Sequence, residues 1–361
     1  MPIPPEVAAV LAGLALPAPA IACRPLAGGH INRSFLVELA APPWGLVLQR
    51  INPGVFPEPV RIMANLRLLA DHLAAKGLPP AQRWQVPALI PAAGGADYLC
   101  TADGALWRAL VQIPDAGHRE RLTSSQEARE VGACLGRFHV WLADLDPRLL
   151  ADPLPGFHDT PRYLADCEAV LAAHPAPLSA EEAWCQAFIA RRRHRVGRLE
   201  EARRRGDMPV RLRHGDPKLA NILFDRQGRA LALIDLDTVG PGLLIHDVAD
   251  CLRSACNQAG EGAAAGEVSF DLGIAAPILE GYFAEASGLW ADQERQLLGS
   301  AVGLMALELG MRFFADHLAG DCYFRVCHAG ANLRRARAQL ELAASIEAQE
   351  EALSRLGQTA G

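Results

Sequence analysis

The hydrophobic pattern of the chain changes character about one third of the way along it. Before that point, short apolar runs alternate with polar positions over residues 21–26, 34–39 and 46–51, and glycines or prolines separate them. Such alternation between turn residues is typical of antiparallel strands. Two more runs, 98–100 and 107–113, flank an Ala-Asp-Gly turn and indicate a hairpin. The first third of the chain is therefore predicted to form a small antiparallel sheet.

Two segments of this region show helical spacing instead. Residues 59–75 place apolar side chains at the helical period, and a Gly-Leu-Pro-Pro run stops the pattern. Residues 6–16 predict a shorter amphipathic helix that ends before two prolines. The sheet is thus expected to carry one long helix.

Beyond a break at 114–117 the pattern is mostly helical. Ser124 or Ser125 can cap the first helix, and the predicted helices cover 124–144, 160–173, 179–205, 272–287, 291–318 and 331–356. Strands at 222–224 and 231–234 form a hairpin around the turn 225–228. We predict a bilobal α+β fold, with a sheet lobe at 1–113 and a larger, mainly helical lobe at 114–361.

Composition narrows the class of protein. The 361 residues are half apolar, which is ample for a packed core, and the net charge of −6 gives no electrostatic footprint for nucleic acid. The N-terminus lacks the pattern of a signal peptide, and no stretch of about 18 uncharged apolar residues predicts a membrane span. The nine cysteines are scattered without C-x-x-C spacing. We therefore expect a cytoplasmic protein, a monomer or homodimer, with no nucleic-acid or membrane partner.

The polar run HGDPKLAN, residues 214–221, carries the chemistry. A histidine, an aspartate two residues later and an asparagine five residues after that have the spacing of a kinase catalytic loop. On that template Asp216 is the base that holds the acceptor hydroxyl, His214 supports it and Asn221 is a ligand of Mg²⁺. Lys218 can reach the γ-phosphate. Turn or cap roles for Asp216 and Asn221 are the structural alternative.

The hairpin that follows this run delivers a second carboxylate. Asp235 stands at the end of the apolar strand 231–234, where burial is costly unless the carboxylate is paired or bound to metal. We predict that Asp235 is the second ligand of Mg²⁺. Loop, strand, turn, strand and aspartate together favour phosphoryl transfer from ATP over a purely structural role.

These segments resemble the aminoglycoside phosphotransferase/choline kinase superfamily, which has a protein-kinase-like fold. More narrowly, the chain looks like the N-acetylhexosamine 1-kinases, and the likeness runs from about residue 21 to about residue 340. It rests on the catalytic loop and on the segments 28–37, 48–56, 235–242 and 308–324. The resemblance implies transfer of the γ-phosphate of ATP to a small-molecule hydroxyl, with the anomeric hydroxyl of an N-acetylhexosamine as the leading acceptor.

The sheet lobe holds the predicted nucleotide site. Gly28 and Gly29 join two strands, and glycines there let backbone N–H groups approach phosphate oxygens. Kinases of this fold usually place a lysine on the third strand, but Gln49 and Arg50 stand there instead. Strand alternation puts the two on opposite faces, so only one can face the nucleotide. The missing lysine leaves ATP or GTP open and motivates a nucleotide-binding pseudokinase as an alternative.

The resemblance also implies acceptor contacts from His30, Arg312 and Tyr323. For His30 the alternative is an exposed loop histidine, and for Arg312 it is an ion pair with Asp316 one helical turn later. Carboxylates after residue 240 keep a cationic acceptor open, namely an aminoglycoside, choline or another small alcohol such as homoserine. They are Asp247, Asp250, Glu261, Glu267 and Asp271. For Asp247 the simplest alternative is helix capping.

Overall fold

The computed structural model describes residues 2–26, 31–77, 86–326 and 328–359. The chain divides into two compact units, Met1–Ala116 and Gly117–Gly361.

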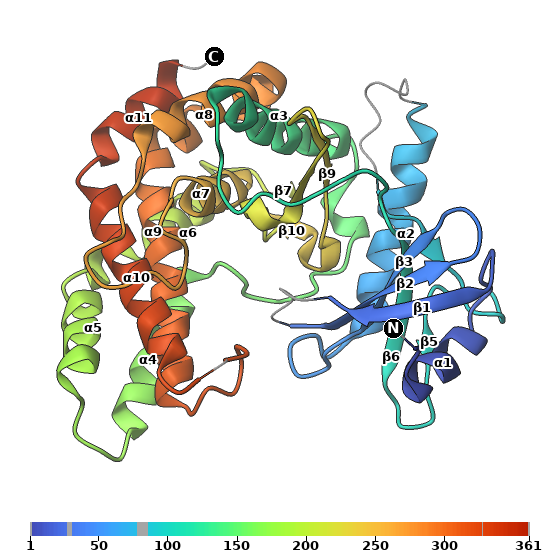
Figure 1. The fold of residues 1–361 in the computed structure, drawn as a ribbon. Coiled ribbons are helices and arrows are strands. Elements are labelled where there is room, and N and C mark those ends of the chain that lie inside the picture. The colour runs from blue at the N-terminus through green and yellow to red at the C-terminus, as the bar shows by residue number, and fades with distance from the viewer. Residues whose placement is uncertain (1, 27–30, 78–85, 327, 360–361) are drawn as a thin grey trace. The chain divides into compact units, whose positions relative to one another are not determined.

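The first unit is built on an antiparallel sheet (Figure 1). Its strand order is β1-β2-β3-β6-β4, and β5 also pairs with β6. The strands are β1 (Ala20–Pro25), β2 (Arg33–Leu39), β3 (Gly45–Arg50), β4 (Leu89–Ile90), β5 (Leu99–Cys100) and β6 (Leu106–Val111). The predicted meander and hairpin are confirmed. The two-residue strand β4 was not predicted, because it is too short to show alternation.

One face of this sheet packs against the first helix. α1 (Pro5–Ala12) buries Val7 and Val10 in a cluster with Leu48 and Trp107 of the central strands. The long helix α2 (Pro59–Ala75) has the bounds that its apolar spacing predicts. The α1 face of the sheet is therefore closed by its own core.

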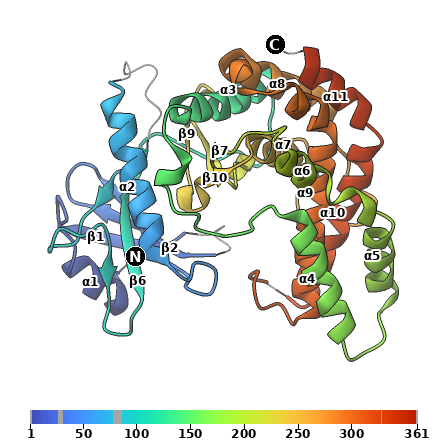
Figure 2. The same cartoon turned by 180° about the vertical axis from the view of Figure 1, so that it is seen from behind.

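The second unit is mainly helical (Figure 2). Its helices are α3 (Ser125–Leu142), α4 (Thr160–Ala173), α5 (Ala180–Ala190), α6 (Arg198–Arg205), α7 (Leu244–Ala255), α8 (Leu272–Ala286), α9 (Asp292–Leu318), α10 (Ala331–Glu347) and α11 (Glu350–Thr359). The Ser124 side chain caps α3 by accepting a hydrogen bond from the N–H of Glu127 at 3.1 Å. Fold class is as predicted: a small sheet with one long helix, followed by a larger helical part.

Two helices predicted as continuous are broken. The segment 179–205 divides into α5 and α6, because Arg192 and Arg195 leave the helix to pair with Glu347 and Glu350 of the C-terminal helices. Arg192 and Glu347 are 2.7 Å apart and their side chains are 17% and 18% exposed. Arg192 and Arg195 are thus partly buried and paired with carboxylates. The segment 331–356 likewise divides into α10 and α11.

Four short strands complete the second unit. β7 (Arg211–Arg213) pairs with β10 (Gly240–Gly242), and β8 (Ile222–Phe224) pairs with β9 (Ala230–Leu233). The β8–β9 hairpin was predicted, and Asp225 closes its turn by accepting from the N–H groups of Gln227 and Arg229. β7 and β10 are three residues each and carry no pattern that would predict them.

Helices α3 and α8 lie side by side at glycine contacts. A Cβ on Gly132 would lie 1.8 Å from the carbonyl oxygen of Ile278, and a Cβ on Gly281 would lie 2.1 Å from that of Arg129. Only glycine permits so close an approach of two backbones. The contact sets the spacing between the two helices.

Helix α9 is the longest helix of the described chain. Its 27 residues would suffice by length and composition to cross a membrane, but 83% of its most apolar window is buried within the protein. Burial of this kind is expected of the central helix of a domain. α9 is therefore a core helix.

Candidate active site

The run 214–221 forms a loop between β7 and β8. Gly215 has a φ of 89°, and a Cβ at this position would lie 2.8 Å from the carbonyl oxygen of Thr238. The Thr238 hydroxyl donates a 2.8 Å hydrogen bond to the His214 carbonyl. Because only glycine adopts this backbone without strain, Gly215 provides the turn that precedes Asp216.

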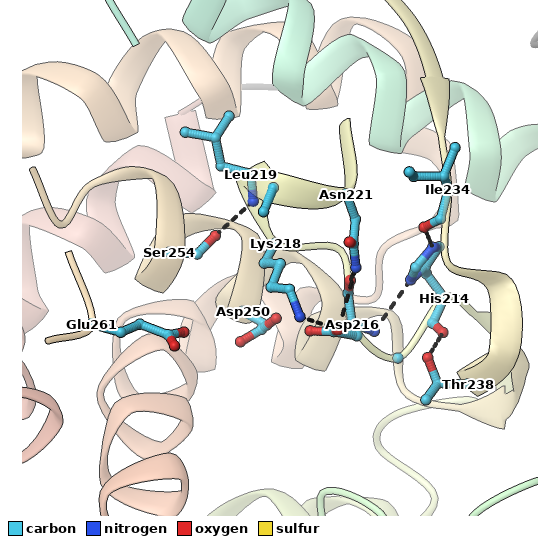
Figure 3. Close-up of polar contacts among 12 residues, drawn as sticks. His214, Asp216, Lys218, Leu219, Asn221, Ile234, Thr238, Asp250, Ser254 and Glu261 are labelled. Carbon is cyan, nitrogen blue, oxygen red and sulfur yellow. Dashed lines mark hydrogen bonds and ion pairs between the residues drawn. The ribbon is translucent and has the colours of Figure 1, made fainter. Parts of the chain in front are cut away.

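Asp216 is held by two side chains of the same loop (Figure 3). The Nζ of Lys218 lies 2.6 Å from its Oδ2, and the amide nitrogen of Asn221 donates to its Oδ2 at 3.2 Å and to its carbonyl at 2.8 Å. The Asp216 and Lys218 side chains are each 29% exposed. Within the described part of the chain, Oδ1 of Asp216 has no hydrogen-bond partner, so it is the atom left to accept a proton from a bound hydroxyl.

Lys218 lies in the field of two carboxylates. Burial by itself would lower the pKa of Lys218, but the charges of Asp216 and Asp235 outweigh it and raise that pKa above its ordinary value. Lys218 is therefore a fixed cation at neutral pH. The structure places it on Asp216, from which it would have to swing to reach a phosphate.

His214 is fully buried behind the loop. Its Nε2–H donates to the carbonyl of Ile234 at 3.0 Å, and its Nδ1 accepts from the N–H of Asp216 at 3.2 Å. Burial lowers the pKa of His214, so the ring is neutral. The ring thus links Asp216 to the end of the hairpin, and the catalytic role predicted for His214, support of Asp216, stays a prediction.

Asn221 and Asp235 are brought together by the β8–β9 pairing. The N–H of Ile234 donates to the carbonyl of Asn221 at 2.8 Å, which places Asp235 one residue beyond this contact. Asp235 is exposed and has a φ of 65°, a left-handed backbone that aspartate tolerates better than most residues. Since the Asn221 amide nitrogen faces Asp216, its amide oxygen is presented for a cation.

This pair of oxygen donors fits Mg²⁺. The ion prefers oxygen ligands and is usually held by one or two carboxylates together with water and substrate phosphates. Across the described ranges, no group of three or more His, Cys, Asp and Glu side chains could hold a metal by itself. An ion at Asn221 and Asp235 would therefore need the phosphates of a nucleotide to complete its coordination.

Asp247, on α7, braces the catalytic loop from behind. Its Oδ2 accepts from the N–H of His214 at 2.6 Å and its Oδ1 from the N–H of Gly215 at 2.9 Å. Its side chain is fully buried, and no side chain caps α7. Burial by itself would raise the pKa of Asp247, but the hydrogen bond from His139 and nearby positive charge hold that pKa below its ordinary value. The carboxylate is therefore ionised, and it accepts hydrogen bonds from the catalytic loop instead of capping α7.

The brace continues through two more helices. His139 of α3 lies 3.0 Å from Asp247 through Nε2 and 2.8 Å from the Tyr282 hydroxyl of α8 through Nδ1. The indole N–H of Trp290 donates to the same hydroxyl at 2.9 Å. Since Tyr282 accepts from Trp290, it can donate to His139, which then donates to Asp247. His139 could not be predicted as part of this network, because a histidine in an apolar helix is usually an ordinary core residue.

The other acidic groups of this region also have protein partners. Asp250 lies 2.7 Å from Arg253, and Arg253 lies 3.5 Å from Glu261. Glu267 accepts from the N–H of Ala264, and Asp271 caps α8. Figure 3 shows Asp250 and Glu261 on the Lys218 side of Asp216.

Arg312 of α9 lies among aromatic rings. Within the described residues its guanidinium makes no hydrogen bond and no ion pair, so the predicted alternative of an Asp316 partner is not what the structure shows. Its central carbon lies within 6 Å of four ring centroids. They belong to Phe157 (5.2 Å), Tyr163 (5.0 Å), Tyr323 (5.8 Å) and Phe324 (5.4 Å).

Asp316 instead holds the loop that supplies two of these rings. It accepts from the N–H groups of Tyr323 and Phe324 at 2.7 and 2.9 Å, and from the amide of Asn332 at 2.9 Å. Tyr323 is 37% exposed. Burial by itself would lower the pKa of Arg312, but the nearby Tyr163, Tyr323, Glu308 and Asp216 together raise that pKa above its ordinary value. Arg312 and Tyr323 belong to the same compact unit as Asp216, Gly117–Gly361.

In the first unit, Gln49 and Arg50 point to opposite faces of the sheet, as alternation predicts. Arg50 lies 3.2 Å from Asp103 and 3.7 Å from Glu6 of α1. Gln49 accepts from the guanidinium of Arg108 at 2.7 and 2.9 Å. Arg108 is a buried cation on the Gln49 face that sequence reasoning missed. The predicted Gly28, Gly29 and His30 lie outside the described residues.

Comparison with known proteins identifies the family. Residues 22–285, most of the chain, match the profile described as "Phosphotransferase enzyme family". The chain belongs to this family. Family membership and the loop geometry together make the protein a phosphotransferase that acts on hydroxyl groups of small molecules.

Solved structures of related phosphotransferases share its fold. An aminoglycoside phosphotransferase from Alicyclobacillus acidocaldarius is 16% identical and aligns over 99% of this chain and 97% of its own, with a TM-score of 0.64. A microcompartment-associated aminopropanol kinase is 20% identical over 95% and 97%, with a TM-score of 0.61. A spectinomycin phosphotransferase, solved with ADP and spectinomycin, is 13% identical over 91% and 94%, with a TM-score of 0.56. The protein-kinase-like fold predicted for this phosphotransferase is thereby confirmed.

Proposed function

We propose that the protein is an ATP- and Mg²⁺-dependent kinase of a neutral sugar, with the anomeric hydroxyl of an N-acetylhexosamine as acceptor. The observation that carries the choice of acceptor is Arg312, a cation that lies among four aromatic rings and, within the described residues, makes no hydrogen bond or ion pair. A guanidinium can donate several hydrogen bonds to sugar oxygens, and the rings around it offer the apolar surface that sugar faces contact. Tyr323, and His30 by resemblance, would add further contacts.

A cationic acceptor is the weaker candidate. Choline-like ammonium groups are bound by aromatic cages, and here the four rings around Arg312 already hold the protein's own cation. The carboxylates of this region are also engaged, Asp250 and Glu261 with Arg253 and Asp247 with the loop. A second positive charge would meet repulsion from Arg312 and little free negative charge. A pseudokinase is disfavoured because Asp216, Asn221 and Asp235 form an intact set.

The proposed chemistry follows from these positions. The acceptor hydroxyl donates to Oδ1 of Asp216 and attacks the γ-phosphorus of ATP, so a new O–P bond forms, the bond to the β-phosphate oxygen breaks and ADP leaves. The proton passes to Asp216. Asn221 and Asp235 would hold Mg²⁺, which when bound supplies positive charge to the phosphate oxygens. Lys218 holds Asp216 in place through their 2.6 Å ion pair until the acceptor binds.

In the first unit we propose that the nucleotide lies on the face that carries Gln49 and Arg108. The opposite face, with Arg50, is covered by α1 and its core. Gln49 is oriented by Arg108, whose buried charge takes the place of the absent lysine. Gly28 and Gly29 remain our proposed phosphate-contacting turn.

Substitutions on the two faces should therefore differ. We expect Arg108→Met to raise the KM for ATP about 10- to 100-fold, since losing one charge-assisted hydrogen bond costs on the order of 1.5–3 kcal/mol. Arg50→Met, the matched control, should leave the KM for ATP within about twofold because exposed ion pairs contribute little. Steady-state kinetics at saturating acceptor measure both. A larger rise in the KM for ATP in Arg50→Met than in Arg108→Met would indicate that the nucleotide binds on the Arg50 face instead.

Incubation with Mg-ATP and a panel of acceptors tests the proposed function. We expect ADP release with N-acetylhexosamines and little with choline, ethanolamine, homoserine or aminoglycosides. Arg312→Met should then raise the KM for the sugar about 10- to 100-fold, as loss of hydrogen bonds from a charged group implies, with the KM for ATP unchanged. Turnover of a cationic acceptor and none of any sugar would refute the acceptor. Mg-dependent nucleotide binding without turnover on any acceptor would favour the pseudokinase.

A further inference from the structure

His158 occupies a position that the proposed reaction does not yet use. It is 6% exposed, stands two residues before α4 and has a φ of 66°, a left-handed backbone that is uncommon for residues other than glycine. Its Nε2 lies 2.9 Å from the carbonyl oxygen of Gly215, the residue before Asp216. Its Nδ1 lies 2.9 Å from Oε1 of Glu308 on α9. The ring thus bridges the catalytic loop and the core helix.

Each of the two contacts of the His158 ring is a hydrogen bond only if a hydrogen lies between its two atoms. A carbonyl oxygen and a carboxylate both only accept, so either His158 is an imidazolium or Glu308 carries a proton. Oε2 of Glu308 also accepts from the Thr160 hydroxyl at 2.8 Å. The other titratable groups nearby are His246, whose ring centroid is 5.3 Å away, and Arg213, whose charge interacts with that of Glu308.

The residues of this bridge also lie next to Arg312, the residue proposed to bind the acceptor. Glu308 precedes Arg312 by four residues, one turn of α9. Phe157, adjacent to His158, packs on the imidazole with centroids 4.0 Å apart and lies 5.2 Å from the Arg312 guanidinium. One dipeptide therefore contacts both the carbonyl before the proposed base and the proposed acceptor-binding arginine.

We propose that His158 is a positioning residue that fixes Arg312 relative to Asp216 through Glu308 and Gly215. The inference rests on the proposed function, since Arg312 must bind the acceptor and Asp216 must take its proton. A misplacement of about 1 Å between acceptor and base can cost about 100-fold in rate, although no contact to substrate is lost. We therefore expect replacement of His158 to lower kcat and to leave nucleotide binding unchanged.

A set of amide substitutions tests this role. In His158→Gln, an amide can donate to Gly215, but its oxygen then faces the Glu308 carboxylate, so we expect kcat to fall about 10- to 100-fold with the KM for ATP unchanged. In the double variant with Glu308→Gln, the second amide donates to the first and rebuilds the bridge without charge. We expect it to recover most of the lost kcat, which is a coupling that a double-mutant cycle measures.

His317→Gln is the matched control, because His317 also pairs from α9 with a glutamate, Glu182, at 3.0 Å. The His317→Gln substitution should lower the midpoint temperature of thermal unfolding without lowering kcat. A His158→Gln variant whose kcat equals that of the control, or a double variant no faster than the single one, would overturn the inference. The assay uses whichever acceptor the wild type phosphorylates, with Asp216→Asn in parallel. Full turnover by Asp216→Asn would refute the proposed base instead, so the two failures are distinguishable.

Discussion

Replacing Asp216 with asparagine should lower kcat by about 10²- to 10⁴-fold, the usual contribution of a general base. The amide cannot take the proton of the acceptor hydroxyl, and it no longer attracts the Lys218 ammonium 2.6 Å away. Because that ion pair is partly exposed, its loss should change the free energy of unfolding by less than about 1 kcal/mol. Single-turnover kinetics with the preferred acceptor, beside a thermal melt, separate the two effects.

The chain offers a close control for this substitution. Asp207 pairs with Arg205 at 2.7 Å, also two residues apart and also partly exposed. Asp207→Asn removes the same kind of ion pair away from the loop, and we expect wild-type kcat. Retention of more than about a tenth of kcat in Asp216→Asn would contradict its role as the base.

Replacing Asp247 with alanine should cost about 3–5 kcal/mol in the free energy of unfolding, as expected when one partner of a buried charged network is removed. The N–H groups of His214 and Gly215 would lose their acceptor, and His139 would lose its partner. The catalytic loop would then relax, so kcat should fall as well. Denaturant titration with the activity of the folded fraction measures both losses.

The capping interpretation of Asp247 predicts a much smaller effect. Asp271→Ala, which removes a helix cap on α8, should cost only about 1 kcal/mol. An Asp247→Ala loss no larger than that would contradict the bracing role.

The contribution of Asp247 should also depend on pH. Its pKa is lower in the folded protein than in the unfolded chain, so its stabilisation is present above about pH 4, the ordinary carboxyl value, and is lost as pH falls toward the folded value. The difference in unfolding free energy between wild type and Asp247→Ala should therefore narrow only below about pH 4.

Much of the fold follows from local pattern. Strands β1, β2, β3 and β6 and helix α2 were predictable because alternation or helical spacing continues over whole elements between clear turn residues. The breaks at 191–197 and 348–349 were not, because their cause is tertiary. Arg192 and Arg195 meet Glu347 and Glu350 from the far end of the chain, and no local pattern records such pairing.

The candidate site likewise has one part that the sequence predicts and another that it does not. Asp216, Lys218 and Asn221 lie in one loop, and the hairpin register brings Asp235 to them, so sequence spacing sufficed. The surroundings of Arg312 and the contacts of His158 join residues from distant helices and could not be predicted. His214 shows the limit of a motif, since the spacing identified the residue but not the burial of its ring.

The close contact of α3 and α8 has a consequence for how this enzyme can diverge. His139 and Tyr282 meet across these two helices, and the glycine contacts at Gly132 and Gly281 hold the helices near enough for them to do so. Substitutions that enlarge either glycine would separate the two side chains that support Asp247, although neither glycine lies in the catalytic loop. Relatives that keep this brace are therefore constrained at small residues that a survey of active-site positions alone would overlook.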